Sequence, residues 1–345
     1  MNRKQLLIST ALIALAAVVL LIVPDKPRAT YHTNNGYVFG TYYAIQYESV
    51  SDLHDSIKAA FASFDASLSM FNPKSTLSRI NAGTDSVVDA YFVQMYRTAE
   101  EVNSLSDGAF DITVAPLVNL WGFGLKNRAH VEAEQVESLL PHVGMGKISL
   151  VAVNDGSERL VLRKSDSDVK VDAGAIAKGQ SCDIIANLLS RNGCTNYLVD
   201  IGGEVVAKGC SSRGEAWRIG VTRPIDDASG EKNEVQIILQ TTDMALATSG
   251  NYRNFYYDGE QKRSHTIDPR TGYPVQHSLL SATVRSNSCM RADALATACM
   301  VLGHEDALRM IEADSLSACF LIVADSITDT DSVALRTICS SRWKE

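Results

Sequence analysis

The chain has 345 residues, 46% hydrophobic and 21% charged, as in a folded globular protein with one large domain or two smaller ones. Its formal net charge of −8 at pH 7 argues against nucleic acid as a partner, and a phosphate ligand would need local donors or a cation. Seven cysteines without a CxxC motif or a histidine-paired cluster argue against zinc; we expect most to be buried, and one disulfide stays open.

An uncharged apolar run, residues 6–23, lies near the start of the chain. A bilayer-spanning helix needs about 20 such residues, whereas the apolar region of a signal peptide has about 7–15. Arg3 and Lys4 precede the run, which favours export of the remainder of the chain. We expect residues 1–23 to be an uncleaved inner-membrane anchor, with a cleaved signal sequence as the alternative. The exported part would lie on the periplasmic side, after a polar linker at 24–36.

The first half of the chain is predicted to contain both strands and helices. Residues 37–49 alternate in polarity and are rich in Tyr, as a strand is. Residues 52–71 and 89–108 have apolar residues at helical spacing, and 71–83 between them has the chemistry of turns. A third helix is expected within 131–144.

The second half continues this mixture, which favours an α+β fold. Strand patterns occupy 147–153, 159–164, 196–209, 217–224, 235–250, 278–288 and 318–325, and helical patterns occupy the end of 169–193, 290–303 and 304–314. Short turns separate several strands, so we expect mixed, largely antiparallel sheets with packed helices in a single domain at 37–345. Neither GxGxxG nor GxxxxGK[ST] occurs, so no Rossmann site or P-loop is indicated.

The predicted helix at 290–303 is apolar except for two side chains that share one face. Asp293 and Thr297 are four residues apart, so a carboxylate and a hydroxyl point the same way. Asp293 could simply cap the helix, and Thr297 could bond back to a carbonyl one turn earlier. Both are also hard oxygen ligands that suit Mg²⁺, and this ion would bring a phosphate ligand to an acidic protein.

Two glycine-containing segments are candidates for ligand contact. VDAGAIAKG (171–179) places Asp172 and Lys178 beside glycines that permit close approach, and Lys178 supplies a cation for an anionic ligand. The alternative is a solvated turn before a helix, with Asp172 as its cap. In DIGGEVVAKG, the glycine pair 202–203 lies within a strand pattern, which indicates a bulge or a backbone packed against a neighbour.

Three further segments carry polar groups in turn-like sequence. SHTIDPRTGYPV holds His265, a candidate general base, and Asp268, although a lone loop histidine is more often structural. GAFDITVAP places Phe110 beside Asp111, which suits a flat polar ring unless Phe110 belongs to the core. TSGNYRNF (248–255) groups hydroxyls, an amide and an arginine that could hold phosphate oxygens or form a turn.

Together these segments resemble the ApbE family of FAD:protein FMN transferases. The resemblance rests on FGTYYAI, FNPKSTLSRIN, GAFDITVAPLVNLWGFG, VDAGAIAKGQSCD, YLVDIGGEVVAKG, LATSGNYRNF, HTIDPRTGYPV and ADALATACMVLG, which occur in family order. It implies binding of FAD with Mg²⁺ and transfer of FMN to a Thr or Ser hydroxyl of an acceptor protein, with release of AMP. The implied acceptor is a subunit of a membrane redox complex.

The same resemblance implies roles for individual residues. Asp293 and Thr297 would ligate Mg²⁺, together with main-chain oxygen at Ala175 and Ala296. His265 and Lys178 join Asp293 and Thr297 as catalytic candidates. Contacts to FAD are implied for Phe39, Phe71, Ala109, Phe110, Asp111, Asp172, Lys178 and Ile267. His265 and Asp268 would shape the loop over the flavin.

Two positions depart from the family pattern. Position 39 is Phe where the family commonly has Met, which changes the packing near the flavin. Ala296 stands where some relatives carry an acidic residue, so only its backbone oxygen could ligate. The apolar N-terminal segment also takes the place of the usual lipoprotein cysteine.

Rival functions stay open for this sequence. The same residues could serve an FAD pyrophosphatase that yields FMN and AMP, with water in place of the acceptor. An exported flavin carrier would bind FAD without turnover. A membrane-anchored structural protein would bind no flavin.

Overall fold

The computed structural model describes residues 28–125, 130–154, 156, 158–225, 234–252, 254–327 and 333–343. The expected membrane anchor at 1–23 lies outside them. Among the helices of the described residues, none has both the length and the apolar content that a bilayer crossing requires.

An eight-stranded sheet forms the centre of the fold, in the order β1-β2-β6-β7-β10-β13-β14-β15. Its strands are β1 Thr30–Val38, β2 Thr41–Ser49, β6 Tyr197–Ile201, β7 Glu204–Lys208, β10 Asp243–Gly250, β13 Leu279–Ser286, β14 Ala318–Ile327 and β15 Val333–Cys339. Every neighbouring pair in it is antiparallel. The expected α+β architecture with largely antiparallel sheets is therefore confirmed.

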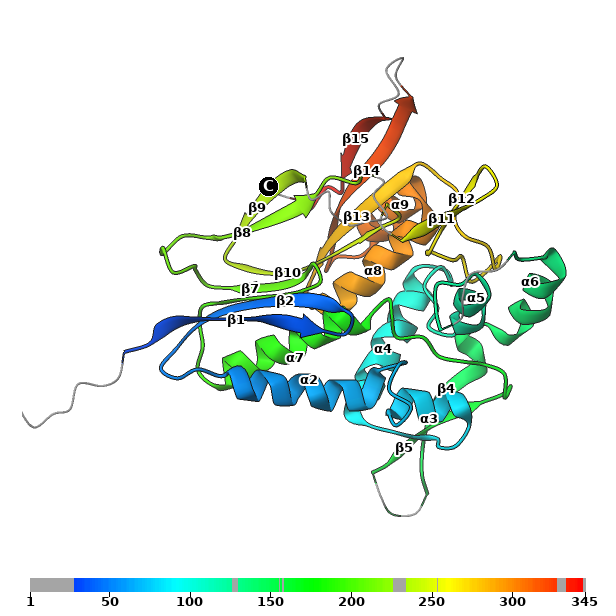
Figure 1. Ribbon diagram of the computed structural model, residues 1–345, viewed down its shortest axis with the longest axis horizontal. Coiled ribbons are helices and arrows are strands. Elements are labelled where there is room, and N and C mark those ends of the chain that lie inside the picture. Colours follow the sequence, from blue (N-terminus) through cyan, green and yellow to red (C-terminus); the bar gives the residue numbers. More distant parts are fainter. Residues whose placement is uncertain are drawn as a thin grey trace, which may run out of the picture.

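Smaller sheets and helices surround this sheet. The remaining strands are β3 Val87–Val88, β4 Ile148–Ala152, β5 Leu160–Lys164, β8 Trp217–Thr222, β9 Val235–Thr241, β11 Phe255–Asp258 and β12 Gln261–Ser264. The helices are α2 His54–Leu68, α3 Thr76–Ala82, α4 Ala90–Leu105, α5 Ala115–Leu120, α6 Ala133–Leu139, α7 Ala177–Arg191, α8 Cys289–Leu302 and α9 His304–Ala313. Helices α2, α7 and α8 lie on one side of the large sheet, and the β8–β9 ribbon lies on the other (Figure 1).

The N-terminal strand begins earlier than the sequence predicts. The polar segment expected to be a linker up to residue 36 forms most of β1, which pairs with β2 along its whole length. The chain reverses at Phe39 and Gly40, whose φ angles are 51° and 76°, as a two-residue hairpin requires.

Two other segments fold differently from the prediction. The turn-like segment 71–83 contains helix α3, which Ser75 caps by accepting a hydrogen bond from the Ser78 N–H, 3.0 Å away. The glycine pair at 202–203 is not a bulge, but the alternative of a backbone packed against a neighbour is confirmed, since a Cβ at Gly202 would lie 2.8 Å from the Thr41 side chain. Gly202 and Gly203 have φ angles of 66° and 98° and form the tight turn between β6 and β7.

Helix α8 is buried on almost every side, as a helix at the centre of a large core should be. It packs against β10 and β13 of the sheet and against α4, α7 and α9. A buried network of hydrogen bonds can act as a polar anchor for such a helix, because its donors and acceptors fit together in one arrangement only.

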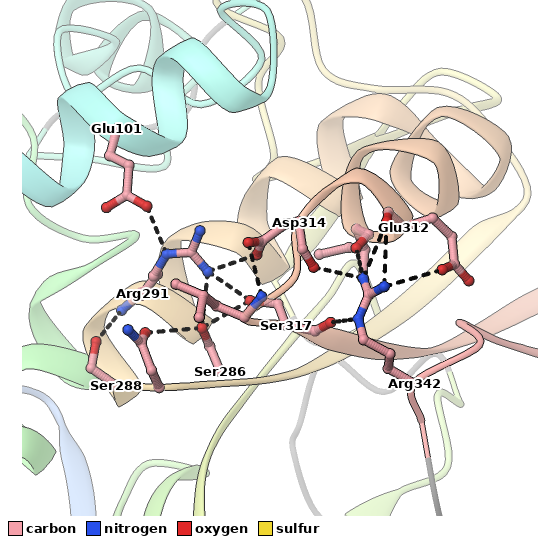
Figure 2. A network of polar contacts seen from close by, with 11 residues as sticks. Glu101, Ser286, Ser288, Arg291, Glu312, Asp314, Ser317 and Arg342 are labelled. Carbon is pink, nitrogen blue, oxygen red and sulfur yellow. Dashed lines mark hydrogen bonds and ion pairs between the residues drawn. The ribbon is translucent and has the colours of Figure 1, made fainter.

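Arg291, in the first turn of α8, provides that anchor (Figure 2). Its guanidinium donates to Glu101 of α4 at 2.9 Å, to Asp314 at 2.7 Å and to the Ser317 hydroxyl at 2.7 Å. A planar group with several donors holds such a network in one orientation. The position of α8, and hence of the polar side chains further along it, is fixed relative to α4 and the segment after α9.

Helices α7 and α8 touch at Gly179. A Cβ atom added there would lie against the Cys289 carbonyl oxygen and 2.8 Å from the Asp293 Cβ. The sequence pattern predicts that Gly179 lets a ligand approach the backbone. In the structure, the absence of a side chain at Gly179 makes room for α8 instead. The close contact brings Lys178, one residue earlier, next to Asp293.

We predict that Gly179→Ala destabilises the protein by about 1–3 kcal/mol, because the added methyl forces α7 and α8 apart. Urea unfolding of the purified protein measures this difference. Gly146→Ala is the matched control, since a Cβ at Gly146 meets no atom within 4 Å. Equal stability of the two variants would show that the helices do not depend on this contact.

Candidate active site

Lys178, at the start of α7, is half-buried and lies beside two buried carboxylates. Its Nζ donates to the Glu204 carboxylate at the first position of β7. Glu204 has a side-chain exposure of 2%, and its second oxygen, Oε2, has no hydrogen-bond partner among the described residues. Burial works against the charge on Lys178, but Glu204 and Asp293 outweigh it and raise the lysine pKa.

Asp293 is the second carboxylate of this group. Its Oδ2 accepts a hydrogen bond from the Gly179 N–H at 3.0 Å. Burial raises the pKa of Asp293 and of Glu204, and the positive charge of Lys178 opposes both shifts because it favours the ionised carboxylates. Two buried carboxylates thus face one ammonium group, an excess of negative charge that a divalent cation would balance.

Oxygen ligands suitable for such a cation lie along the same face of α8. Thr297 follows Asp293 by one turn, is half-buried, and its hydroxyl lies 3.3 Å from that of Ser249 at the end of β10. The Gly179 N–H donates to Asp293 rather than to the Ala175 carbonyl four residues earlier, which leaves that oxygen available. A carboxylate, hydroxyls and a carbonyl are the hard donors that Mg²⁺ prefers, so the residues fit this ion.

Ala296, the other predicted ligand, is fully buried in the middle of α8. Its methyl group packs in the core, and its carbonyl belongs to the ladder of the helix. Asp293, Thr297 and the Ala175 carbonyl carry the candidate oxygens outside the helix ladder, and ligation by the Ala296 main chain stays a prediction.

A cavity of about 530 Å³ opens beside Lys178. Its size lies within the range of small-molecule pockets. The predicted FAD contacts Phe39, Phe71 and Lys178 line it, together with Gly40, Phe64, Asp65, Leu68, Ser69, Met70, Ala173, Gly174 and Ala177. Phe39 packs edge-on against Phe64, whereas Phe71 is 78% exposed. The cavity therefore has one fixed aromatic wall and one accessible aromatic ring.

The loop at 264–275 is held rigidly by its own polar groups. The Asp268 carboxylate accepts from the Arg270 backbone N–H and from its guanidinium, all at 2.9 Å. The Trp121 indole donates to the Gly272 carbonyl at 2.8 Å, and Ile267 is buried beside Trp121. Asp268 shapes this loop, as the sequence predicts, and Ile267 attaches it to the core.

His265 in this loop is set up as a proton acceptor. Its Nδ1 lies 3.2 Å from the Asn254 carbonyl oxygen, so Nδ1 carries the proton and Nε2 keeps its lone pair. Burial lowers the pKa of His265, the Asn254 contact opposes this, and the charge of Lys178 lowers the pKa further. The imidazole is therefore neutral at pH 7 and feels the charge of Lys178.

The remaining predicted FAD contacts have structural partners in the fold. Ala109 and Phe110 are buried, Phe110 in the main core. Asp111 accepts from the backbone N–H groups of Thr113 at 2.7 Å and Met145 at 2.9 Å. Asp172 accepts from the Gly174 N–H at 2.6 Å, which forms a turn before α7 rather than a cap on it. None of these four side chains lines the cavity of Lys178.

A second cluster of candidate metal ligands lies elsewhere in the described residues. The ligand atoms of His142, Asp166 and Asp168 lie within 4.8 Å of one another. His142 Nδ1 is already bonded to the Asp166 carboxylate at 2.6 Å. The cluster shares no residue with the predicted site.

Sequence reasoning missed Glu204. A glutamate at the start of a strand is usually solvated, so the sequence pattern does not single it out. The available signal was Val206, which shares a face of β7 with Glu204 and packs against a core cluster.

The fold and the cavity define a ligand-binding enzyme domain with a charged centre, and comparisons with known proteins give its family. The ApbE family model matches residues 39–320, so the chain belongs to the ApbE family. The protein named FAD:protein FMN transferase from Vibrio cholerae is 35% identical over 325 residues, covering 91% of this chain and 94% of its own length. Its namesake from Haemophilus influenzae is 33% identical over 330 residues, covering 92% and 93%.

Solved structures agree with this assignment. The flavin transferase ApbE from Vibrio cholerae superposes with a TM-score of 0.77 at 34% identity, covering 91% of this chain and 98% of that one. The flavinyl transferase ApbE from Pseudomonas stutzeri, in its apo form, gives a TM-score of 0.77 at 29% identity, covering 92% and 96%. The resemblance read from the sequence is confirmed.

We predict that His265 titrates below its ordinary pKa of 6.5 and that Lys178→Gln raises this value, because a nearby positive charge disfavours the imidazolium. NMR titration of the histidine ring protons measures both effects. Lys208→Gln, which removes an exposed lysine of β7, should leave the pKa of His265 unchanged. An equal response to both substitutions would place His265 away from Lys178.

Proposed function

We propose that this protein transfers FMN from FAD to a Thr or Ser hydroxyl of an acceptor protein, in a reaction that depends on Mg²⁺ and releases AMP. The observation that carries the proposal is the position of Lys178, which lines the cavity, adjoins Gly179 where α7 pairs with Asp293, and acts through its charge on His265. Membership of the ApbE family, whose curated relatives carry the name FAD:protein FMN transferase, supports it.

The residues around the cavity divide the work of binding FAD. Phe39 and Phe71 offer aromatic surface to the isoalloxazine ring. Lys178 supplies a cation for the diphosphate. Asp293, Thr297 and the Ala175 carbonyl would hold Mg²⁺, which when bound neutralises the charge that builds up on the phosphate oxygens.

His265 is the proposed general base of the transfer step. The acceptor hydroxyl oxygen forms a bond to the phosphorus of the FMN half, and its proton passes to His265 Nε2. The bond from that phosphorus to the bridging oxygen breaks, and AMP leaves with both bonding electrons. The rigid loop built by Asp268 keeps the imidazole in place for this transfer.

We further propose that the acceptor is an exported subunit of a membrane redox complex. The uncharged segment 6–23, preceded by Arg3 and Lys4, supports a membrane anchor with the enzyme on the periplasmic side. This position would place the site where it meets such acceptors.

Intact-mass measurement of an acceptor protein incubated with enzyme, FAD and Mg²⁺ tests the reaction. The proposal predicts a mass increase equal to one FMN and an equal amount of AMP, both lost when EDTA removes the metal. AMP release without a gain in acceptor mass would identify a pyrophosphatase. Bound FAD without release of AMP would identify a carrier.

In the same assay, Asp293→Ala should lower the transfer rate by about 100-fold or more, because the ligand of the charge-neutralising ion is lost. It should also weaken FAD binding in the presence of Mg²⁺. Asp168→Ala, from the second cluster of candidate ligands, is the control and should transfer at the normal rate. The reverse result, with Asp168 required and Asp293 dispensable, would reject the assignment of the metal site.

A further inference from the structure

Glu204 is attached to the start of α7 through both its main chain and its side chain. The Cys182 thiol donates to its carbonyl oxygen at 3.1 Å, and Lys178 Nζ donates to its carboxylate. The tight turn at Gly202 and Gly203 positions it, because Glu204 pairs directly with Ile201 across that turn. Because both its main-chain carbonyl and its carboxylate have hydrogen-bond partners, Glu204 has little freedom to move.

The two carboxylates near Lys178 have different partners. Glu204 accepts the ammonium group, whereas Asp293 accepts only a neutral backbone N–H from Gly179 among the described residues. Yet Asp293 also lies next to Lys178, because its carboxylate and Cβ contact Gly179, the following residue, and the charge of Lys178 opposes the rise in pKa that burial causes in both carboxylates. Lys178 therefore has two carboxylates nearby and forms an ion pair with one of them, Glu204.

We infer that Glu204 is a positioning residue that holds the Lys178 ammonium away from Asp293 and so keeps the Asp293 carboxylate open for the metal ion. This inference rests on the proposed function, because it concerns the same metal and the same ligand. Glu204 would act through Lys178 and not on the reacting atoms themselves.

The physical reason is competition between two cations for one carboxylate. An ammonium group and Mg²⁺ seek the same lone pairs, and in a buried site an ion pair between Lys178 and Asp293 would be strong. Glu204 offers the ammonium a better placed partner. When the side chain at position 204 carries no charge, the Lys178 ammonium group pairs with Asp293 instead. The metal ion must then displace the ammonium group before it can bind.

Two substitutions of Glu204 separate charge from shape. Glu204→Gln keeps the size of the side chain and removes its charge, whereas Glu204→Asp keeps the charge and shortens the side chain by one methylene. Mg²⁺ is titrated into the full-length protein at fixed FAD, with quenching of flavin fluorescence as the readout. We expect the apparent Kd for Mg²⁺ to rise about tenfold in Glu204→Gln and to stay within about threefold in Glu204→Asp.

Glu48→Gln is the matched control. Glu48 is a half-buried glutamate of β2 in the same sheet, and it accepts a hydrogen bond from Asn196 at 2.6 Å rather than from a lysine of the described residues. Its Kd for Mg²⁺ should equal that of the wild type. If Glu204→Gln also behaves as the wild type, or if Glu204→Asp is the weaker of the two, shape rather than charge matters and the inference is wrong.

A double variant tests whether Glu204 acts through Lys178. In a Lys178→Gln background no ammonium competes for Asp293, so adding Glu204→Gln should cause no further loss of Mg²⁺ affinity. A full additional tenfold loss would mean that Glu204 acts on the metal directly and would overturn the inference. Thermal unfolding of each variant without ligands verifies that it is folded.

The wild type separates this inference from the proposed function. If wild-type protein binds FAD equally well with and without Mg²⁺, both the metal-dependent function and the role of Glu204 are rejected. If the wild type needs Mg²⁺ and the Glu204 variants do not differ from it, only the role of Glu204 is rejected.

Discussion

The buried charge balance around Lys178 constrains the rest of the structure. The Lys178 ammonium pairs with the buried Glu204 carboxylate, and the buried Asp293 carboxylate lies beside it on the Gly179 backbone. Such a group is stable only where its geometry is fixed, because a misplaced buried charge costs several kcal/mol. The two carboxylates carry more negative charge than one ammonium group balances, so the site favours a divalent cation. Such a cation would in turn attract the phosphates of a flavin nucleotide.

The surrounding elements supply the fixed geometry. Helix α8 carries Asp293 and Thr297 and is anchored by Arg291 (Figure 2), while Gly179 lets α7 come close enough for Lys178 to join them. The β6–β7 turn positions Glu204, and the β1–β2 turn positions Phe39 in the lining of the cavity. Parts of the chain far apart in sequence therefore meet at one end of the sheet, where each contributes one or two groups.

Features that arise from residues close together in the sequence could be predicted, whereas features that arise from tertiary contacts could not. The Asp293–Thr297 face follows from helical spacing alone, and the family resemblance added Lys178, His265 and the aromatic residues. Glu204 could not be found in this way, because its importance arises from a strand and a helix that meet only in the folded protein. The inward orientation of Phe110, left open between core and ligand, was likewise decided by tertiary packing.

The central claim is that a divalent ion binds between Asp293 and Thr297 and holds the diphosphate of FAD beside Lys178. A crystal structure with FAD and Mn²⁺, measured at the manganese absorption edge, tests it most directly. We expect an anomalous peak in contact with Asp293, Thr297 and the FAD phosphates, with the flavin between Phe39 and Phe71. A peak at His142 and Asp166, or FAD bound outside the cavity of Lys178, would contradict it.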